Sequence, residues 1–368
     1  MRATAFLLTL GLLGCPKPDP DGDDTGPEED TTDPQDTDDT DDTDEPDPCT
    51  TATVTFEVTG GATQDLTAMF QTGDYVTLAV PGTLKVCPGT WYSRVLVRAD
   101  VTVLGLGATP ADTILSGGLS GTILDVMGPN VTLDVSNVTL DRGAGLDVAH
   151  NSGGGGVYCE QAGTVIVSDA VFTNNEANDG PGMYTQDCTV EVRNAAFYDN
   201  VSEDDGGAIT LWGTTASFEH VQIHDNRSLD GGGIAAFSSA ITASDLSVTD
   251  NIAEGGFGGG IWLYDSDISL TDGEFSNNTD EGGIYAGGLL VYGSATLTRV
   301  SFSGNSAPLG GGLFVYYEGV VQGTDCEFNG NSPEDVFASD GTPEGGKSYT
   351  LTGSTSFTCQ DNACEFDG

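Results

Sequence analysis

The stretch FYDNVSEDDGGAITLW, from Phe197 to Trp212, has an outline that recurs along the chain. An apolar residue is followed three positions later by Asn, then by acidic residues, then by glycines and another apolar residue. Asparagines hold the same place in seven copies, 25 to 27 residues apart: Asn175, Asn200, Asn226, Asn251, Asn278, Asn305 and Asn331. Because two elements stay in phase over seven copies, the pattern indicates a solenoid built from an internal repeat.

Within each copy the apolar residues alternate with polar ones, as at Ile268 and Leu270. A period of two predicts strands, and about 26 residues accommodate three short strands and three turns. Strands of successive copies would then pair in parallel, about 4.8 Å apart, with equivalent residues stacked. We therefore expect each Asn to hydrogen-bond to the Asn of the neighbouring copies, as a structural ladder inside the turn. The glycines are expected at a bend that needs positive φ or close backbone approach.

The GGAI of Gly206–Ile209, paired with the Phe-x-x-Asn element, resembles the repeat of chlamydial polymorphic outer-membrane proteins and related bacterial surface proteins. The resemblance covers roughly residues 154–331 and implies an all-β chain, a right-handed parallel β-helix of the pectin-lyase-like fold. Upstream segments have the same alternation without the Asn and Gly marks, so we place the β-helix at residues 76–332, in nine to eleven coils. Residues 49–75 are expected to form an N-terminal strand and helix cap, and residues 333–368 a C-terminal cap.

The N-terminal segment MRATAFLLTLGLLGC resembles the signal and lipobox of bacterial lipoproteins, since Gly14 precedes Cys15 after a short apolar run. The resemblance implies removal of residues 1–14 and a lipid on Cys15; the alternative is an ordinary secretory signal with an incidental cysteine. Residues 15–48 are expected to be a disordered linker, because 16 of the 33 residues after Cys15 are Asp or Glu. We expect an exported monomer, lipid-anchored to the bacterial cell envelope, at the outer membrane or cell surface.

The formal net charge of −47 argues against nucleic acid or anionic lipid as a partner. It fits either solubility or attraction for divalent cations. Acidic residues precede each glycine bend, and stacking would bring their carboxylates together: Asp179, Asp204, Asp205, Asp230, Glu254, Asp280 and Glu281. A solvated acidic loop is the favoured interpretation, because the turns vary in length and the calcium-binding nonapeptide pattern is absent. No cofactor is therefore predicted, and calcium is the alternative, with Asp179, Asp205, Asp230 and Asp280 as candidate ligands.

The remaining cysteines suggest three disulfides in an exported protein. Candidate pairs are Cys49 with Cys87, Cys159 with Cys188, and Cys359 with Cys364. Cys326 would be left as a buried free thiol, because it lies two residues before core-facing Phe328.

Aromatic residues cluster just after the glycine bends: Trp212, Trp262, Tyr264, Tyr285, Tyr292, Tyr316 and Tyr317. They are interpreted first as ordinary strand residues, some of them in the core, and the alternative is that they stack along one face and hold sugar rings. The repeat itself is read as architecture. The sequence therefore favours a non-catalytic, adhesin-like binding module or a structural module, with a glycan or a surface protein as partner.

The alternative is a polysaccharide lyase or glycoside hydrolase. A lyase needs clustered cations, whereas Arg193, Arg227 and Arg299 are far apart in the sequence. A hydrolase needs a carboxylate pair. The acids that precede the ladder asparagines repeat as Asp199, Asp225 and Asp250, which favours a structural position. The histidines, His150, His220 and His224, match no metal-site pattern.

Overall fold

The structure is a computed structural model that describes residues 49–50, 53–145, 153–161, 163–283, 285–341, 345–351, 353–360 and 363–367. The chain divides into two units, Met1–Glu45 and Pro46–Gly368, and every described residue lies in the second. The predicted signal peptide, Cys15, the linker and His150 therefore lie outside the described residues. Among the described residues, no helix has the length and apolar character needed to cross a membrane.

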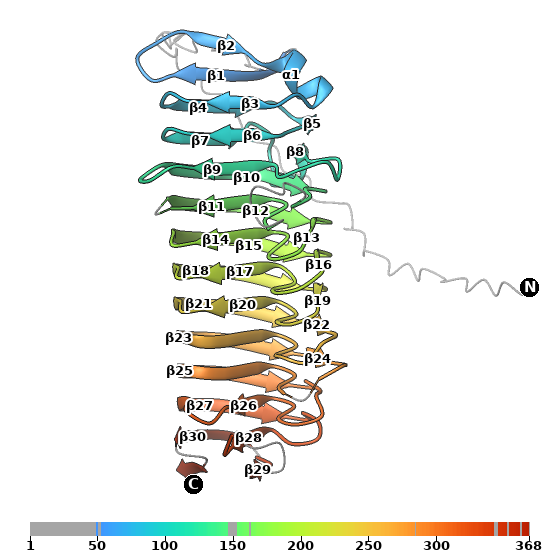
Figure 1. The fold of residues 1–368 in the computed structure, drawn as a ribbon, viewed down its shortest axis with the longest axis vertical. Coiled ribbons are helices and arrows are strands. Elements are labelled where there is room, and N and C mark those ends of the chain that lie inside the picture. The colour runs from blue at the N-terminus through green and yellow to red at the C-terminus, as the bar shows by residue number, and fades with distance from the viewer. Residues whose placement is uncertain are drawn as a thin grey trace, which may run out of the picture. The chain divides into compact units, whose positions relative to one another are not determined.

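The second unit is an all-β solenoid of about nine turns, with a repeat of about 26 residues. Its coils stack one on the next along a single axis (Figure 1). Each full coil has three strands, and each strand pairs in parallel with its equivalent in the next coil. The predicted parallel β-helix is confirmed.

Three columns of strands make the repeat region. The first column contains β11 (Val157–Glu160), β14 (Met183–Gln186), β17 (Ile209–Trp212), β20 (Ile234–Phe237), the first part of β23 (Ile261–Ser276) and of β25 (Leu289–Ser303), β26 (Leu313–Val315) and β28 (Val336–Ser339). The second contains β12 (Thr164–Thr173), β15 (Thr189–Tyr198), β18 (Thr215–His224), β21 (Ala240–Thr249), the later parts of β23 and β25, and β27 (Val320–Asn329). The third contains β13 (Glu176–Ala177), β16 (Val201–Ser202), β19 (Arg227–Ser228), β22 (Ile252–Ala253) and β24 (Thr279–Asp280).

The segment before the repeat continues the same stack. Its strands are β3 (Val76–Leu78), β4 (Gly82–Val86), β5 (Gly89–Tyr92), β6 (Val95–Val97), β7 (Val101–Gly105), β8 (Thr113–Ser116), β9 (Leu124–Met127) and β10 (Thr132–Asp141), with the 3-10 helix η1 (Pro110–Asp112). β9 pairs with β11 and β10 pairs with β12, so the unmarked coils run directly into the marked ones.

Both ends of the stack are covered by antiparallel strands. At the N-terminal end, β1 (Val54–Val58) pairs antiparallel with β4 and with β2 (Thr63–Asp65), and helix α1 (Thr67–Thr72) buries Phe70. At the C-terminal end, β30 (Gly353–Gln360) pairs antiparallel with β27 and β31 (Ala363–Asp367), and β29 (Gly346–Tyr349) with β28. These pairings occupy sheet edges that would otherwise be open. Parallel pairing reaches β28, so the solenoid extends past the predicted boundary at residue 332.

The apolar residue of each Phe-x-x-Asn element stacks in the core. Phe172 and Phe197 lie 4.3 Å apart between ring centroids, and Phe275 and Phe302 lie 4.9 Å apart. All four are fully buried. Such stacking follows from parallel register, because equivalent residues of successive coils face the same direction.

The seven repeat asparagines form a continuous ladder in the turn that follows. The Nδ2 of each residue from Asn175 to Asn305 donates to the Oδ1 of the next, at 2.9–3.0 Å. Their backbone N–H groups donate to the same oxygens. The ladder places buried amides where each donor and acceptor has a partner.

Two adjacent glycines make the bend possible for different reasons. Gly206 has φ +65°, the left-handed region, and a Cβ on Gly207 would overlap the carbonyl oxygen of Gly232 in the next coil. Left-handed residues also precede the ladder, where Asp199, Asp225 and Asp250 have φ of 54–55°. Asp tolerates this conformation better than most residues, which explains why these acids repeat.

The cysteines pair as Cys49–Cys87, Cys159–Cys188 and Cys359–Cys364, and Cys326 is a buried free thiol. Burial raises the pKa of the Cys326 thiol, so the group is held in its neutral form.

Candidate functional site

The outer surface of the first strand column is the candidate site. In β17, Ile209 and Leu211 point into the core, and Thr210 and Trp212 therefore point outward. Because register is parallel, the outward fourth residue of each strand stacks on its equivalents. From one coil to the next this position holds Gln186, Trp212, Phe237, Tyr264 and Tyr292.

Aromatic rings cover this surface without a break over several coils. Trp212 stacks on Phe237 at 4.0 Å between ring centroids, Tyr264 lies 5.0 Å from Tyr292, and Tyr292 lies 5.4 Å from Tyr316. A parallel row packs beside it, in which Phe257 stacks on Trp262 at 5.0 Å and lies 5.7 Å from Tyr285. We call this surface the aromatic face and define it as Trp212, Phe237, Phe257, Trp262, Tyr264, Tyr285, Tyr292 and Tyr316.

Exposure varies along the aromatic face. Trp212 is 39% exposed and Tyr264 is 47% exposed, whereas Phe237 is held between its neighbours and is 6% exposed. The sequence prediction omitted Phe237 and Phe257. Phe237 could have been found, since it follows its glycine bend at the same distance as Trp212. Tyr317, which was predicted to belong, lies against Gly341 instead.

The residue just before the glycine bend changes character along the stack. Parallel bridges and backbone hydrogen bonds place Gly153, Asp179, Asp205, Asp230, Phe257 and Tyr285 in one column. Asp205 precedes β17, whose second residue is the small Thr210, and Asp230 precedes β20, whose second residue is Ala235. Where the strand has Trp262, the bend residue is Phe257, which stacks on it. One position thus forms both a carboxylate cluster and part of the aromatic face.

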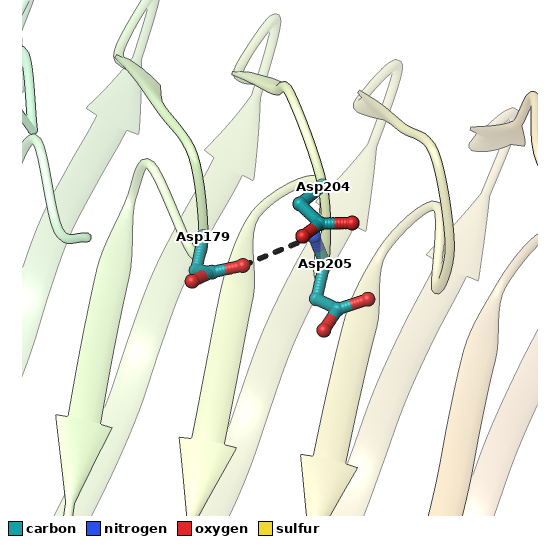
Figure 2. Close-up of side chains that lie close together, drawn as sticks. All are labelled: Asp179, Asp204 and Asp205. Atoms are coloured by element: carbon teal, nitrogen blue, oxygen red, sulfur yellow. Dashed lines mark hydrogen bonds between the residues drawn. The ribbon is translucent and has the colours of Figure 1, made fainter. Parts of the chain in front are cut away.

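The carboxylate cluster consists of Asp179, Asp204 and Asp205, with one oxygen of each within 4.8 Å of the others. Figure 2 shows Asp179 reaching the next coil, where its Oδ1 accepts a hydrogen bond of 3.2 Å from the backbone N–H of Asp205. Burial, and then repulsion from Asp179, Asp204 and Asp230, raises the pKa of Asp205 to about 8. Burial also raises the pKa values of Asp179 and Asp230 to about 6.

Two other predicted members lie elsewhere. Asp280 pairs with Ala253 in the third strand column, so it does not stack on Asp230. Its carboxylate accepts hydrogen bonds from the backbone N–H groups of Gly283 and Tyr285, which gives it a structural role within its own turn. Glu254 forms an ion pair with Arg227. The seven acids therefore do not form one column: Asp179, Asp205 and Asp230 stack in the bend, whereas Asp280 lies in the third strand column and Glu254 pairs with Arg227.

Carboxylate oxygens are the ligands that calcium prefers, so Asp179, Asp204 and Asp205 could together hold a cation.

Each arginine side chain in the repeat is paired with carboxylates. Arg193 contacts Glu191 and Glu219, and Arg299 holds both oxygens of Asp272.

The described histidines pair with surface acids. His220 lies 2.6 Å from Asp245, and His224 lies 2.8 Å from Asp225. His220 and Asp245 occupy a bend where each has left-handed φ.

A separate cleft of about 240 Å³ lies near the N-terminal cap, lined by Tyr92, Arg94 and Ser120 among others. Arg94 is held there by the carbonyl oxygen of Gly73 and lies 4.3 Å from the ring centroid of Tyr75. This cleft is a second location at which a ligand could bind.

The fold and the repeats define a β-solenoid protein. Residues 130–307 match the family described as the right-handed β-helix region, in agreement with the expected handedness. Two solved structures are similar to the chain. Rice weevil pectin methyl esterase is 10% identical with a TM-score of 0.27, and the match covers 55% of this chain and 75% of that one. PfbA, a surface adhesin of Streptococcus pneumoniae, is 11% identical with a TM-score of 0.24, and the match covers 80% and 92%. No curated protein matches the chain. Likenesses this low support no statement on function.

Proposed function

We propose that the protein is a non-catalytic binding module of the bacterial cell surface and that the aromatic face binds a glycan. The observation on which this rests is the run of rings across successive coils, from Trp212 to Tyr316, in which Trp212 and Tyr264 are the most exposed. Aromatic rings pack against the apolar faces of sugars, and one ring per coil repeats every ~4.8 Å along the stack. An extended polymer can therefore meet several rings at once.

The resemblances in the sequence complete the proposal. The lipobox ending in Cys15 would attach the chain to the envelope, and the acidic linker of residues 15–48 would hold the solenoid away from the membrane. The resemblance of the repeat to that of chlamydial polymorphic outer-membrane proteins also supports a location at the cell surface.

The test is retention of the full-length protein on a panel of insoluble polysaccharides. A Trp212→Ala, Tyr264→Ala double variant should bind at least about fivefold more weakly, since each stacked ring contributes about 0.5–1.5 kcal/mol. Tyr92→Ala is the matched control, because Tyr92 has the same 47% exposure as Tyr264 and lines the separate cleft. Unchanged binding by the double variant, or loss of binding only in Tyr92→Ala, would contradict the proposal.

One observation favours hydrolysis as a second function. Asp179 and Asp205 carry carboxyl groups close together beside the aromatic face, and the pKa of Asp205 is raised further than that of Asp179. A protonated acid next to an ionised one is the pair that glycoside hydrolysis requires. Release of new reducing ends in the retention assay, abolished by Asp205→Asn, would establish this activity; intact polymer after long incubation would exclude it for the panel.

A further inference from the structure

The borders of the aromatic face carry acidic side chains. Asp187, Asp265 and Glu318 each follow closely on an outward position of the first strand column, and all three are exposed. Asp187 and Glu318 lie in turns, and Asp265 lies at the irregularity within β23. The Oδ1 of Asp187 lies 2.5 Å from where a Cβ of Gly213 would be, which places this carboxylate beside Trp212 of the next coil. Glu318 is the largest cause of the raised pKa of the Tyr292 phenol, and Asp265 adds to it, so both charges are felt at that ring.

The opposite border is acidic as well. Asp205 and Asp230 stand in the bend column that continues as Phe257 and Tyr285. At the coils of Trp212 and Phe237 the face therefore has carboxyl groups on its other side as well. Because the pKa of Asp205 is raised to about 8 and that of Asp230 to about 6, Asp230 supplies the negative charge there at neutral pH. A ligand lying along the rings would have these groups within about 10 Å, the distance over which charges interact in moderate salt.

Among the described residues of the coils that carry the face, no arginine is left free to balance these acids. Between Met183 and Glu318 the sequence contains three arginines, Arg193, Arg227 and Arg299, and no lysine; the two histidines there pair with surface acids. Each is already paired with a carboxylate: Arg193 with Glu191 and Glu219, Arg227 with Glu254, and Arg299 with Asp272. An anionic polymer on the aromatic face would thus meet repulsion without compensation.

From this arrangement we infer that the polymer bound by the aromatic face is cationic, an amino-sugar chain whose ammonium groups face the flanking carboxylates. The inference rests on the proposed function. A glucosamine polymer presents an apolar ring face for stacking and a positive charge that also interacts favourably with the face of Trp and Tyr. The binding of a neutral sugar would be stabilised by stacking alone, and the binding of a uronate would be weakened by repulsion from the flanking carboxylates.

The experiment compares three oligomers of equal length on the full-length protein by calorimetry: β-1,4-glucosamine with its amines protonated, its fully N-acetylated form, and oligogalacturonate. The first two differ in charge while sharing a backbone. We expect the glucosamine oligomer to bind about tenfold or more tighter than the acetylated one at low salt, and the ratio to approach one in ~1 M salt.

An Asp265→Asn, Glu318→Gln variant isolates the charge effect. Asn tolerates the left-handed φ of Asp265, 48°, so the turn should keep its shape. The variant should weaken binding of the glucosamine oligomer and leave the acetylated oligomer unchanged. Asp245→Asn is the matched control: Asp245 is exposed with φ 52° but pairs with His220 at a different bend.

Each outcome is decisive. Equal affinity for the charged and acetylated oligomers, or tighter binding of oligogalacturonate, would overturn the cationic ligand while leaving the glycan function intact. Failure of every oligomer and polysaccharide to bind would overturn both. Binding of polylysine in place of any glycan would also overturn both, in favour of a basic protein partner.

Discussion

Replacing Asn226 with Ala should destabilise the solenoid by about 5 kcal/mol. Asn226 stands in the middle of the ladder, and its side chain makes five hydrogen bonds. Its Nδ2 donates to the carbonyl oxygens of Phe197 and His224, both at 2.9 Å, and to the Oδ1 of Asn251 at 2.9 Å. Its Oδ1 accepts from the backbone N–H and the Nδ2 of Asn200, at 3.1 and 2.9 Å.

The magnitude follows from those five bonds. A buried hydrogen bond contributes about 1 kcal/mol net, and a buried group left without a partner costs about 1–3 kcal/mol. Asn226→Asp should be at least as damaging at neutral pH, because it loses both N–H donors of the amide and buries a charge. Protonation of that aspartate at acidic pH should recover part of the loss.

The assay is unfolding in urea, monitored by circular dichroism. Asn194→Gly is the control: Asn194 is exposed, makes one side-chain bond of 3.3 Å to Asp169, and has a left-handed φ that Gly adopts freely. We expect a change within about 1 kcal/mol there. If Asn226→Ala cost no more than this control, the ladder would not be an energetic element of the fold, and the reasoning from buried amides would be refuted.

Three further predictions concern the bend and the disulfide. Because the pKa of Asp205 is raised from 3.8 to about 8, its contribution to stability is full below about pH 4 and is lost as the pH rises through 8. At pH 4 the free energy of unfolding of Asp205→Asn should therefore equal that of wild type. At pH 9 the variant should be more stable by ~2 kcal/mol, a value discounted for the solvent that reaches the carboxyl group. Equal stability of the two proteins at pH 9 would contradict the burial argument. Gly207→Ala should cost more than about 3 kcal/mol, since its Cβ would meet the backbone of the next coil, whereas Gly330→Ala, with open space around it, should cost about 1–2 kcal/mol in thermal melts. Replacing Cys159 and Cys188 together with Ala should cost about 3–4 kcal/mol by loop closure over 29 residues, and a reductant should then have no further effect attributable to this pair.

Much of the fold could be predicted because the repeat constrains the same positions in every coil. Inward residues such as Ile209 and Leu211 alternate with outward ones, and this period of two survives in each copy. The last parallel strand, β28, was assigned to the cap because the Phe-x-x-Asn mark ends at Asn331. The last Phe-x-x-Asn element begins in β27 of the second strand column, and the first column extends beyond it by one strand, β28.

The site was harder to predict, since it depends on how turns of unequal length fall over the strands. Asp280 looked equivalent to Asp230 by its distance from the following glycines, yet it lies in the third strand column. Spacing along the chain does not reveal where a turn gains a residue. Phe237 is a different case: its spacing from the glycine bend matches that of Trp212, but the structure holds its ring among those of Trp212, Trp262 and Tyr264, so it joins the face through contact and not through exposure.

The bend column offers a reason to seek a ligand on this side of the solenoid. The backbone there is the same whether the residue is Gly153, Asp179, Asp230, Phe257 or Tyr285. The fold therefore does not require any one of these side chains, in contrast to the ladder asparagines, where each residue serves the next. Half-buried carboxyl groups with raised pKa values are costly, because burial disfavours their charged form. The backbone of the bend therefore does not determine which side chain stands there, and the acids and rings at this position are compatible with the proposed binding function of the neighbouring aromatic face.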